Sequence, residues 1–159
     1  MVHTDKIVKD LEFSYEGVFD FKELLSVIRE YLKRHDYDID EKLYNTSVKD
    51  DLKSTKIKWN ADRKVDDYNK CVVKLTVDLG DYKEGYVDGA KVADGKLKVT
   101  FNAEVERDYG EKWKKNPTKR FIRAVYEKYV TEAKQSKIDG NLKNLIDGLK
   151  KEIKQYLGA

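Results

Sequence analysis

The chain has 159 residues, the usual size of one domain, and its 33 Lys and Arg residues nearly balance its 30 Asp and Glu residues. A formal net charge of +3 excludes strong overall attraction to nucleic acid, and a single cysteine, Cys71, excludes a domain stapled by internal disulfides. Charged residues make up 40% of the sequence, but apolar residues recur at regular spacing, so we expect a folded domain with a charged surface. No signal peptide and no apolar run of membrane-spanning length is present, so we expect a cytoplasmic protein.

The N-terminal part predicts one strand and one helix. Residues 1–8 form a polar lead-in that we expect to be flexible, and residues 11–17 alternate apolar and polar side chains, as a half-buried strand does. Asp20, with Glu23 three positions later, is typical of a helix start, because a side-chain oxygen there accepts from free backbone N–H groups. Apolar residues then recur at helical spacing to about Arg34, which predicts an amphipathic helix.

The central part predicts five further strands separated by polar turns. We expect these strands at residues 37–46, 55–62, 71–78, 86–92 and 97–105. Residues 80–85 begin and end with glycine and are expected to turn, and Asp94-Gly95 predicts a tight hairpin.

The C-terminal part predicts helix. Asn116 followed by Pro117 is typical of a helix start, and apolar residues recur at helical spacing over residues 121–130 and again over 138–157. This region is either one long helix or a helix pair that divides at Gly140. The order β-α-β5-α-α predicts an α+β fold, with an antiparallel sheet of about six strands packed against the C-terminal helix or helix pair in a single domain.

This order of elements, over residues 11–130, resembles the START-like or helix-grip superfamily, in which a curved antiparallel sheet wraps a long C-terminal helix. That family usually has two short helices after its first strand, whereas this sequence predicts one. The resemblance implies a pocket for an apolar small molecule between sheet and helix, but it carries over no binding residue. In this chain we expect Trp59, Val73, Phe101, Tyr126 and Tyr129 to line such a pocket. Residues 59–64 together with Asp67-Tyr68 are also similar to a segment of uncharacterised archaeal proteins, which implies no activity.

No pattern in the sequence specifies catalysis, a cofactor or a metal. The alternating aspartates of residues 36–40 open like an EF-hand loop, but such a loop needs glycine and glutamate where this chain has Glu41 and Ser47. The two histidines and one cysteine lack zinc-ligand spacing. Cys71 falls on the apolar face of its strand, and no nucleophile elbow or phosphate-binding glycine loop occurs. We therefore expect a non-enzymatic protein without a metal or cofactor.

Glu41 is a candidate pocket residue, because strand periodicity places it between Ile39 and Leu43 on the predicted inner face. A buried carboxylate has a raised pKa unless it is paired, and Arg63 or a tyrosine hydroxyl would be a suitable partner. The alternative, which we favour, is a one-residue bulge or an edge strand that lets the side chain reach water, since a shift of one residue reverses the two faces.

A basic segment at the predicted helix start is the second candidate site. Residues 111–123 carry six basic side chains and one acidic side chain, and the backbone N–H groups of a helix start favour anions. Trp113 could stack on a base or insert at a membrane interface; the alternative, which we favour, is that it packs on the core while the lysines are solvated. The anion-binding candidates are Lys112, Trp113, Lys114, Lys115, Lys119, Arg120 and Arg123.

Three functions remain open at this point. The first is a non-enzymatic binding domain that engages a protein partner or itself, because the apolar stripe of residues 138–157 exceeds what one small sheet can cover. The second is the binder of an apolar small molecule, with pocket candidates Glu41, Trp59, Arg63, Phe101, Tyr126 and Tyr129. The third is contact with a polyanion, either nucleic acid or an anionic membrane surface, through residues 112–123.

Overall fold

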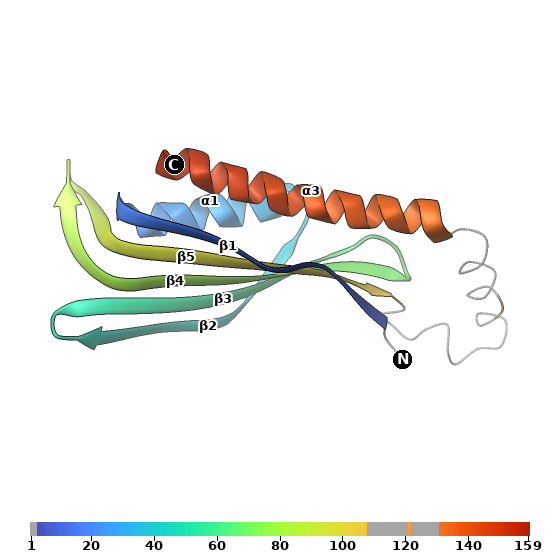
Figure 1. Cartoon of the computed structure of the whole chain (residues 1–159), viewed down its shortest axis with the longest axis horizontal. Helices are drawn as coiled ribbons and strands as arrows, with labels where there is room; N and C mark the ends of the chain where they lie inside the picture. Colours follow the sequence, from blue (N-terminus) through green and yellow to red (C-terminus); the bar gives the residue numbers. More distant parts are fainter. Residues whose placement is uncertain (1–2, 108–120, 122–130) are drawn as a thin grey trace.

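The computed structural model describes residues 3–107, 121 and 131–159. Its elements in chain order are β1 (His3–Phe19), α1 (Phe21–Arg34), β2 (Asp38–Lys49), β3 (Leu52–Lys64), β4 (Asn69–Val87), β5 (Ala90–Arg107) and α3 (Thr131–Leu157). The strands form one antiparallel sheet in the order β1-β5-β4-β3-β2, and both helices lie on one of its faces (Figure 1). The α+β class is therefore confirmed. No helix within the described ranges is long and apolar enough to cross a membrane.

Helix α1 begins where the sequence predicts. The backbone N–H of Glu23 donates to Asp20 Oδ1 at 3.1 Å, so the expected N-cap is present. The apolar stripe of α1 is buried against the sheet and α3: Leu24, Leu25, Ile28, Tyr31 and Leu32. Tyr31 fixes the two helices to each other, because its hydroxyl donates to the carbonyl oxygen of Leu145 at 2.9 Å.

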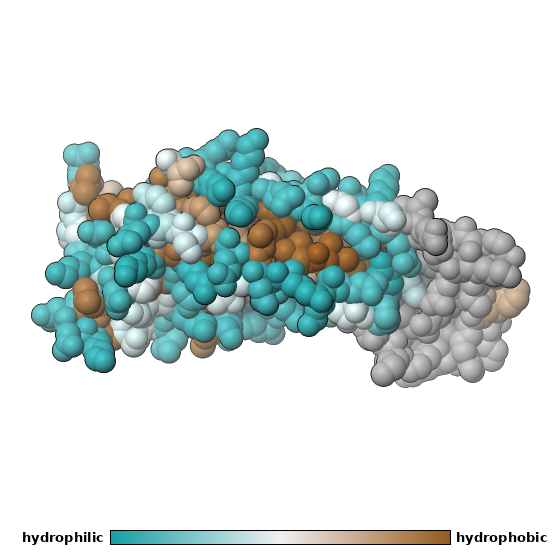
Figure 2. Space-filling view, in the orientation of Figure 1, coloured by the Kyte–Doolittle hydropathy of each residue, from teal (hydrophilic) through white to brown (hydrophobic). Residues whose placement is uncertain are grey.

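The core lies between the helices and the inner face of the sheet. Alternate residues of the three central strands are buried there, among them Ile57, Trp59, Val73, Leu75 and Phe101. The outer face is polar and carries cross-strand ion pairs, including Lys70–Glu106 at 3.2 Å and Lys74–Glu104 at 3.1 Å. An apolar seam runs along the junction of α3 with the sheet (Figure 2), where partly buried residues of β1 such as Ile7, Val8 and Leu11 pack against the core.

The sheet has five strands, not the six that we predicted, because two predicted turns lie inside strands. Residues 80–85 do not turn; they continue β4 through a bulge between Gly80 and Lys83, where Asp81 has φ 49°. The hairpin lies instead at Asp88-Gly89, with φ 50° and 81°, which is the positive-φ pair that tight two-residue hairpins require. Asp94-Gly95, the predicted hairpin, lies within β5.

Both ends of the chain also differ from the sequence prediction. Residues 3–8, expected to belong to a flexible lead-in, form the start of β1 and pair with the end of β5. Helix α3 runs through Gly140 without interruption, so the alternative of a helix pair divided there is wrong. The helix predicted over residues 121–130 lies outside the described residues, apart from Phe121 itself.

Candidate functional site

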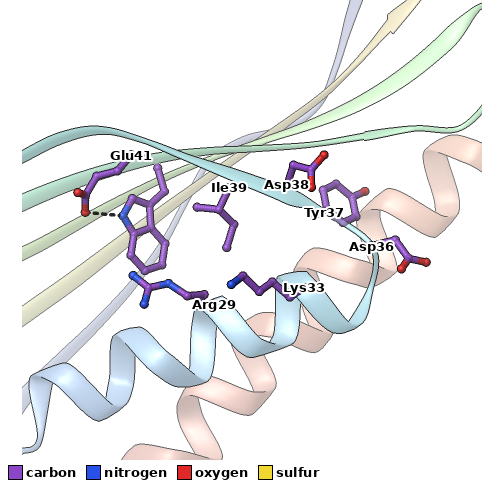
Figure 3. A pocket seen from close by; sticks show the side chains of 8 residues that line it. Arg29, Lys33, Asp36, Tyr37, Asp38, Ile39 and Glu41 are labelled. Carbon is purple, nitrogen blue, oxygen red and sulfur yellow. Dashed lines mark hydrogen bonds between the residues drawn. The ribbon is translucent and has the colours of Figure 1, made fainter.

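An open groove with a volume of about 610 Å³ lies between α1 and β2 (Figure 3). Arg29 and Lys33 of α1 form one wall, Trp59 of β3 lies at the floor, and residues 36–39 and Glu41 form the opposite wall. The Arg29 guanidinium lies over the Trp59 ring, 5.1 Å from its centroid, and Trp59 Nε1 donates to Glu41 Oε1 at 3.0 Å. Arg29 and Lys33 thus face the groove from α1, and the Glu41 carboxylate faces it from β2.

Glu41 faces this groove because it alternates with Ile39 on the helix-covered side of β2, and a bulge after it changes the face of Leu43. Glu41 is opposite Trp59, but Leu43 is already opposite Lys58, so one extra residue lies on the β2 side of the ladder. Glu41 therefore stays on the helix-covered side while Leu43 turns to the outer side. Since β2 is also the sheet edge, the Glu41 carboxylate is exposed. Of the two alternatives that we favoured, the edge strand is what exposes Glu41, whereas the bulge moves Leu43 and leaves Glu41 on the predicted inner face. The hydrogen-bond partner of Glu41 is the Trp59 indole, and Arg63 lies in the neighbouring groove.

A second groove, of about 380 Å³, lies between the end of α1, α3 and the start of β4. It contains Arg63, whose guanidinium lies over the Tyr37 ring, 5.9 Å from the centroid, and Cys71. Burial raises the pKa of Tyr37 well above its usual value, with a smaller contribution from Cys71, while Arg63 opposes the rise. Burial also raises the pKa of the Cys71 thiol. Cys71 is therefore a protonated, buried thiol, which is the unreactive form of cysteine.

The residues predicted to line an apolar pocket do not come together as one site. Trp59 lies at the floor of the α1–β2 groove, whereas Val73 and Phe101 are packed inside the hydrophobic core. Tyr126 and Tyr129 lie outside the described residues. Of the pocket candidates, the structure brings together Glu41 and Trp59, and it places Arg63 in the neighbouring groove.

The basic segment of residues 112–123 also lies outside the described residues, apart from Phe121, whose side chain is 70% exposed. This applies to all seven anion-binding candidates: Lys112, Trp113, Lys114, Lys115, Lys119, Arg120 and Arg123.

Sequence reasoning missed a feature of the edge strand β2, in which every residue except Ile39 is exposed. Residues 43–48, called here the neutral segment, form the longest run without a charged residue in a chain that is 40% charged. Three of its apolar or aromatic side chains face solvent, with exposures of 37% for Leu43, 57% for Tyr44 and 65% for Val48. The uncharged run is visible in the sequence. Its position at the edge of the sheet, which exposes it for binding, is not visible there.

The two edges of the sheet differ in how they meet solvent. Strand β1 carries six charged residues and two register shifts, and at Asp10 (φ 47°) its backbone N–H donates to the Asn102 side chain at 3.0 Å. Such charges and irregularities discourage the addition of another strand. The neutral segment instead pairs with β3 in unbroken register and has no charge. Among the described residues, β1 is therefore a protected edge of the sheet and the neutral segment is an open one.

A small apolar pocket of about 230 Å³ adjoins the neutral segment. Asp20, Phe21, Lys22 and Leu25 line it at the start of α1, together with Tyr44 of the neutral segment, Thr55 of β3 and residues 90–93 of β5. Hydroxyl groups link the strands below it: Thr46 Oγ1 lies 2.9 Å from Thr55 Oγ1, which lies 2.8 Å from the Tyr82 hydroxyl. An apolar side chain could enter this pocket without leaving these hydroxyls unpaired.

Within the described ranges, no group of three or more His, Cys, Asp or Glu side chains is arranged to hold a metal ion. Comparison of the chain with protein-family models, with curated proteins and with solved structures finds no match. Its function is therefore inferred from geometry and chemistry alone.

Proposed function

We propose that this chain is a non-enzymatic binding domain that captures an extended polypeptide segment by strand addition at β2. The observation that carries this proposal is the neutral segment: an exposed, uncharged and regular stretch of edge strand in a chain of which 40% of the residues are charged. In strand addition, the unpaired backbone groups of an edge supply affinity, and pockets for alternate side chains supply specificity.

The surroundings of the neutral segment support both parts of this mechanism. Alternate residues of an edge strand direct their N–H and C=O groups away from the sheet, where they form a template for another strand. Tyr44 and Val48 share the helix-covered side of β2, because Tyr44 pairs with the buried Ile57 and Val48 lies four residues further along. A captured strand would place alternate side chains beside them, next to the pocket lined by Phe21 and Leu25.

The alternative of a START-like binder for an apolar molecule has less support. The first strand pairs with the last and β2 lies at the far edge, an arrangement compatible with a helix-grip fold. However, Val73 and Phe101 fill the space between sheet and helix, and the larger groove beside Trp59 is lined mainly by charged side chains. Apolar ligands favour sites lined by apolar side chains, so this groove suits them poorly.

The proposal is tested by placing lysines on the open edge. Asn45 and Ser47 are exposed and lie on the outer side of β2, so the double change Asn45→Lys/Ser47→Lys blocks strand addition without touching the core. We expect immobilised wild-type protein to select peptides with alternating apolar residues from a random heptapeptide phage library. We expect the double variant to retain those peptides at least about tenfold less, the loss expected for about 1.4 kcal/mol.

The matched control is Thr4→Lys/Ser14→Lys, which adds the same charge to exposed positions on the outer side of β1. This control should retain the selected peptides as the wild type does. Equal retention by the wild type and the β2 double variant would disprove strand addition at β2.

A further inference from the structure

The neutral segment has a property that narrows the choice of partner: it is suited to pair with itself. We propose that the strand captured at β2 is the β2 strand of a second copy of this chain, antiparallel about a two-fold axis at Thr46. This inference rests on the proposed function and adds the identity of the occupant and the register. Strand β2 would then join two five-stranded sheets into one continuous sheet.

The register follows from the bulge and the strand end. Regular pairing begins at Leu43, the first residue after the bulge, and β2 ends at Lys49. The midpoint of residues 43–49 is Thr46. A centre at Asn45 would draw the bulge into the pairing, and a centre at Ser47 would place Tyr44 opposite Asp50, beyond the end of β2.

The faces of the strand agree with this register. A two-fold axis perpendicular to the sheet leaves each side chain on its own face, so directly opposite residues must share a face. With the centre at Thr46, Tyr44 is opposite Val48 of the second copy, and both lie on the helix-covered side. Aromatic and β-branched side chains that face each other across a ladder stabilise it, and here the pair occurs twice.

Charge and hydrogen bonding also permit the pairing. In this register Lys49 of each copy lies opposite Leu43 of the other, so no two like charges lie directly opposite each other within residues 43–49. The Thr46 hydroxyl is already hydrogen-bonded to Thr55 at 2.9 Å, so a second strand over it leaves no hydroxyl unsatisfied.

The other edge explains why pairing would stop at two copies. Strand β1 is protected by its charges, its register shifts and the left-handed backbone at Asp10. When each copy has one open edge, two copies that pair through it in a two-fold, self-complementary contact form a closed dimer with no open edge left. Two open edges on each copy would instead permit a filament.

The test is a disulfide across the axis. Opposite residues in an antiparallel ladder have Cα atoms about 4.5–5.5 Å apart, within the range of about 4.4–6.8 Å that disulfides span. Under mild oxidation, Thr46→Cys should form a covalent dimer. Asn45→Cys, whose two copies would be roughly 8 Å apart by the rise of a strand, should not. Wild-type protein supplies the background, because its only cysteine, Cys71, is buried.

Sedimentation equilibrium gives a second readout that needs no cysteine. The wild type and the Thr4→Lys/Ser14→Lys control should show a concentration-dependent dimer, and Asn45→Lys/Ser47→Lys should stay monomeric. Preferential cross-linking of Asn45→Cys, or a monomeric wild type at millimolar concentration, overturns the inference. If the wild type is monomeric but still retains heptapeptides through β2, the proposed function stands with another chain as partner; if it does neither, both proposals fail.

Discussion

At the scale of single residues, Arg107 holds three elements together. It lies at the end of β5 with 4% of its surface exposed, and its guanidinium pairs with Asp5 of β1 and, at 3.3 Å, with Asp139 of α3. Breaking a buried ion pair costs more than breaking an exposed one, because the remaining charges lose both partner and solvent.

We expect Arg107→Met to lower the free energy of unfolding by about 3 kcal/mol, the lower end of what breaking a buried pair costs, since both aspartates stay partly exposed. Arg34→Met is the matched control, because its pair with Glu152 lies at the surface, and we expect a loss of less than about 1 kcal/mol. Urea unfolding measures both values. Equal losses in the two variants would show that Arg107 does not hold the sheet to α3.

Residue-scale features of the fold were predictable where the cause is local. The Asp20 cap and the burial of Trp59 and Phe101 follow from helix-start chemistry and from strand alternation. The hydrogen bond between Trp59 and Glu41 does not follow from the sequence, because it requires Glu41 to lie opposite Trp59. That register is set by the pairing of β2 with β3, which local patterns do not specify.

At the scale of elements, two of the four Asp-Gly dipeptides in the chain show what local signals leave undecided. Asp88-Gly89 and Asp94-Gly95 carry the same hairpin signal, but only the first is a turn. The register between β4 and β5 determines which dipeptide forms the turn. The two strands pair, with one bulge, from Asn69 opposite Arg107 to Val87 opposite Ala90, so the chain reverses at Asp88-Gly89. Gly95 serves a different purpose: a Cβ there would lie 2.5 Å from Tyr82 Cβ and 2.9 Å from Tyr82 Cα.

We expect Gly95→Ala to destabilise the protein by about 1–3 kcal/mol, as overpacking against a fixed backbone does. Gly85→Ala, in the same β4–β5 ladder, has nothing within 4 Å of the added carbon and is the matched control, with a change within about 0.5 kcal/mol. Thermal unfolding followed by circular dichroism compares the two. A neutral Gly95→Ala would mean that β4 can shift away at Tyr82.

At the scale of the whole molecule, alternation predicted a half-covered antiparallel sheet, and the structure has one. The order of strands was beyond the sequence, because it depends on which distant segments pair. The edge position of β2 could not be predicted for the same reason. An uncharged run indicates a binding edge only where, among the described residues, no further strand pairs with it.

Stability should decline in alkaline solution, because burial raises the pKa of three tyrosines in the described chain, Tyr31, Tyr37 and Tyr156. For Tyr156, burial and the nearby Glu23 and Asp20 raise the pKa from 10.0 to about 12. A raised pKa means that the folded state holds its proton more firmly than the unfolded state. This contribution is therefore complete below pH 10 and is lost as the pH rises toward 12.

The urea midpoint of the wild type, measured between pH 9 and pH 12, should fall as the pH rises. The midpoint of Tyr156→Phe should fall less steeply over the same range. Tyr86→Phe, at a side chain that is 76% exposed, should leave the slope as it is in the wild type. A wild-type midpoint that stays constant over this range would contradict the expectation.

The pairing of β1 with β5 affects how the chain can fold while it is being synthesised. His3 is opposite Arg107, so the first strand emerges from the ribosome about a hundred residues before its partner. At roughly 5–20 residues per second, that delay lasts about 5–20 s. During this interval β2, β3 and β4 can form successive hairpins, while Phe13 and Phe19 of β1 stay without the strand that buries them. This apolar segment of the nascent chain therefore stays without its partner strand at least until residues 93–99 of β5 have been translated.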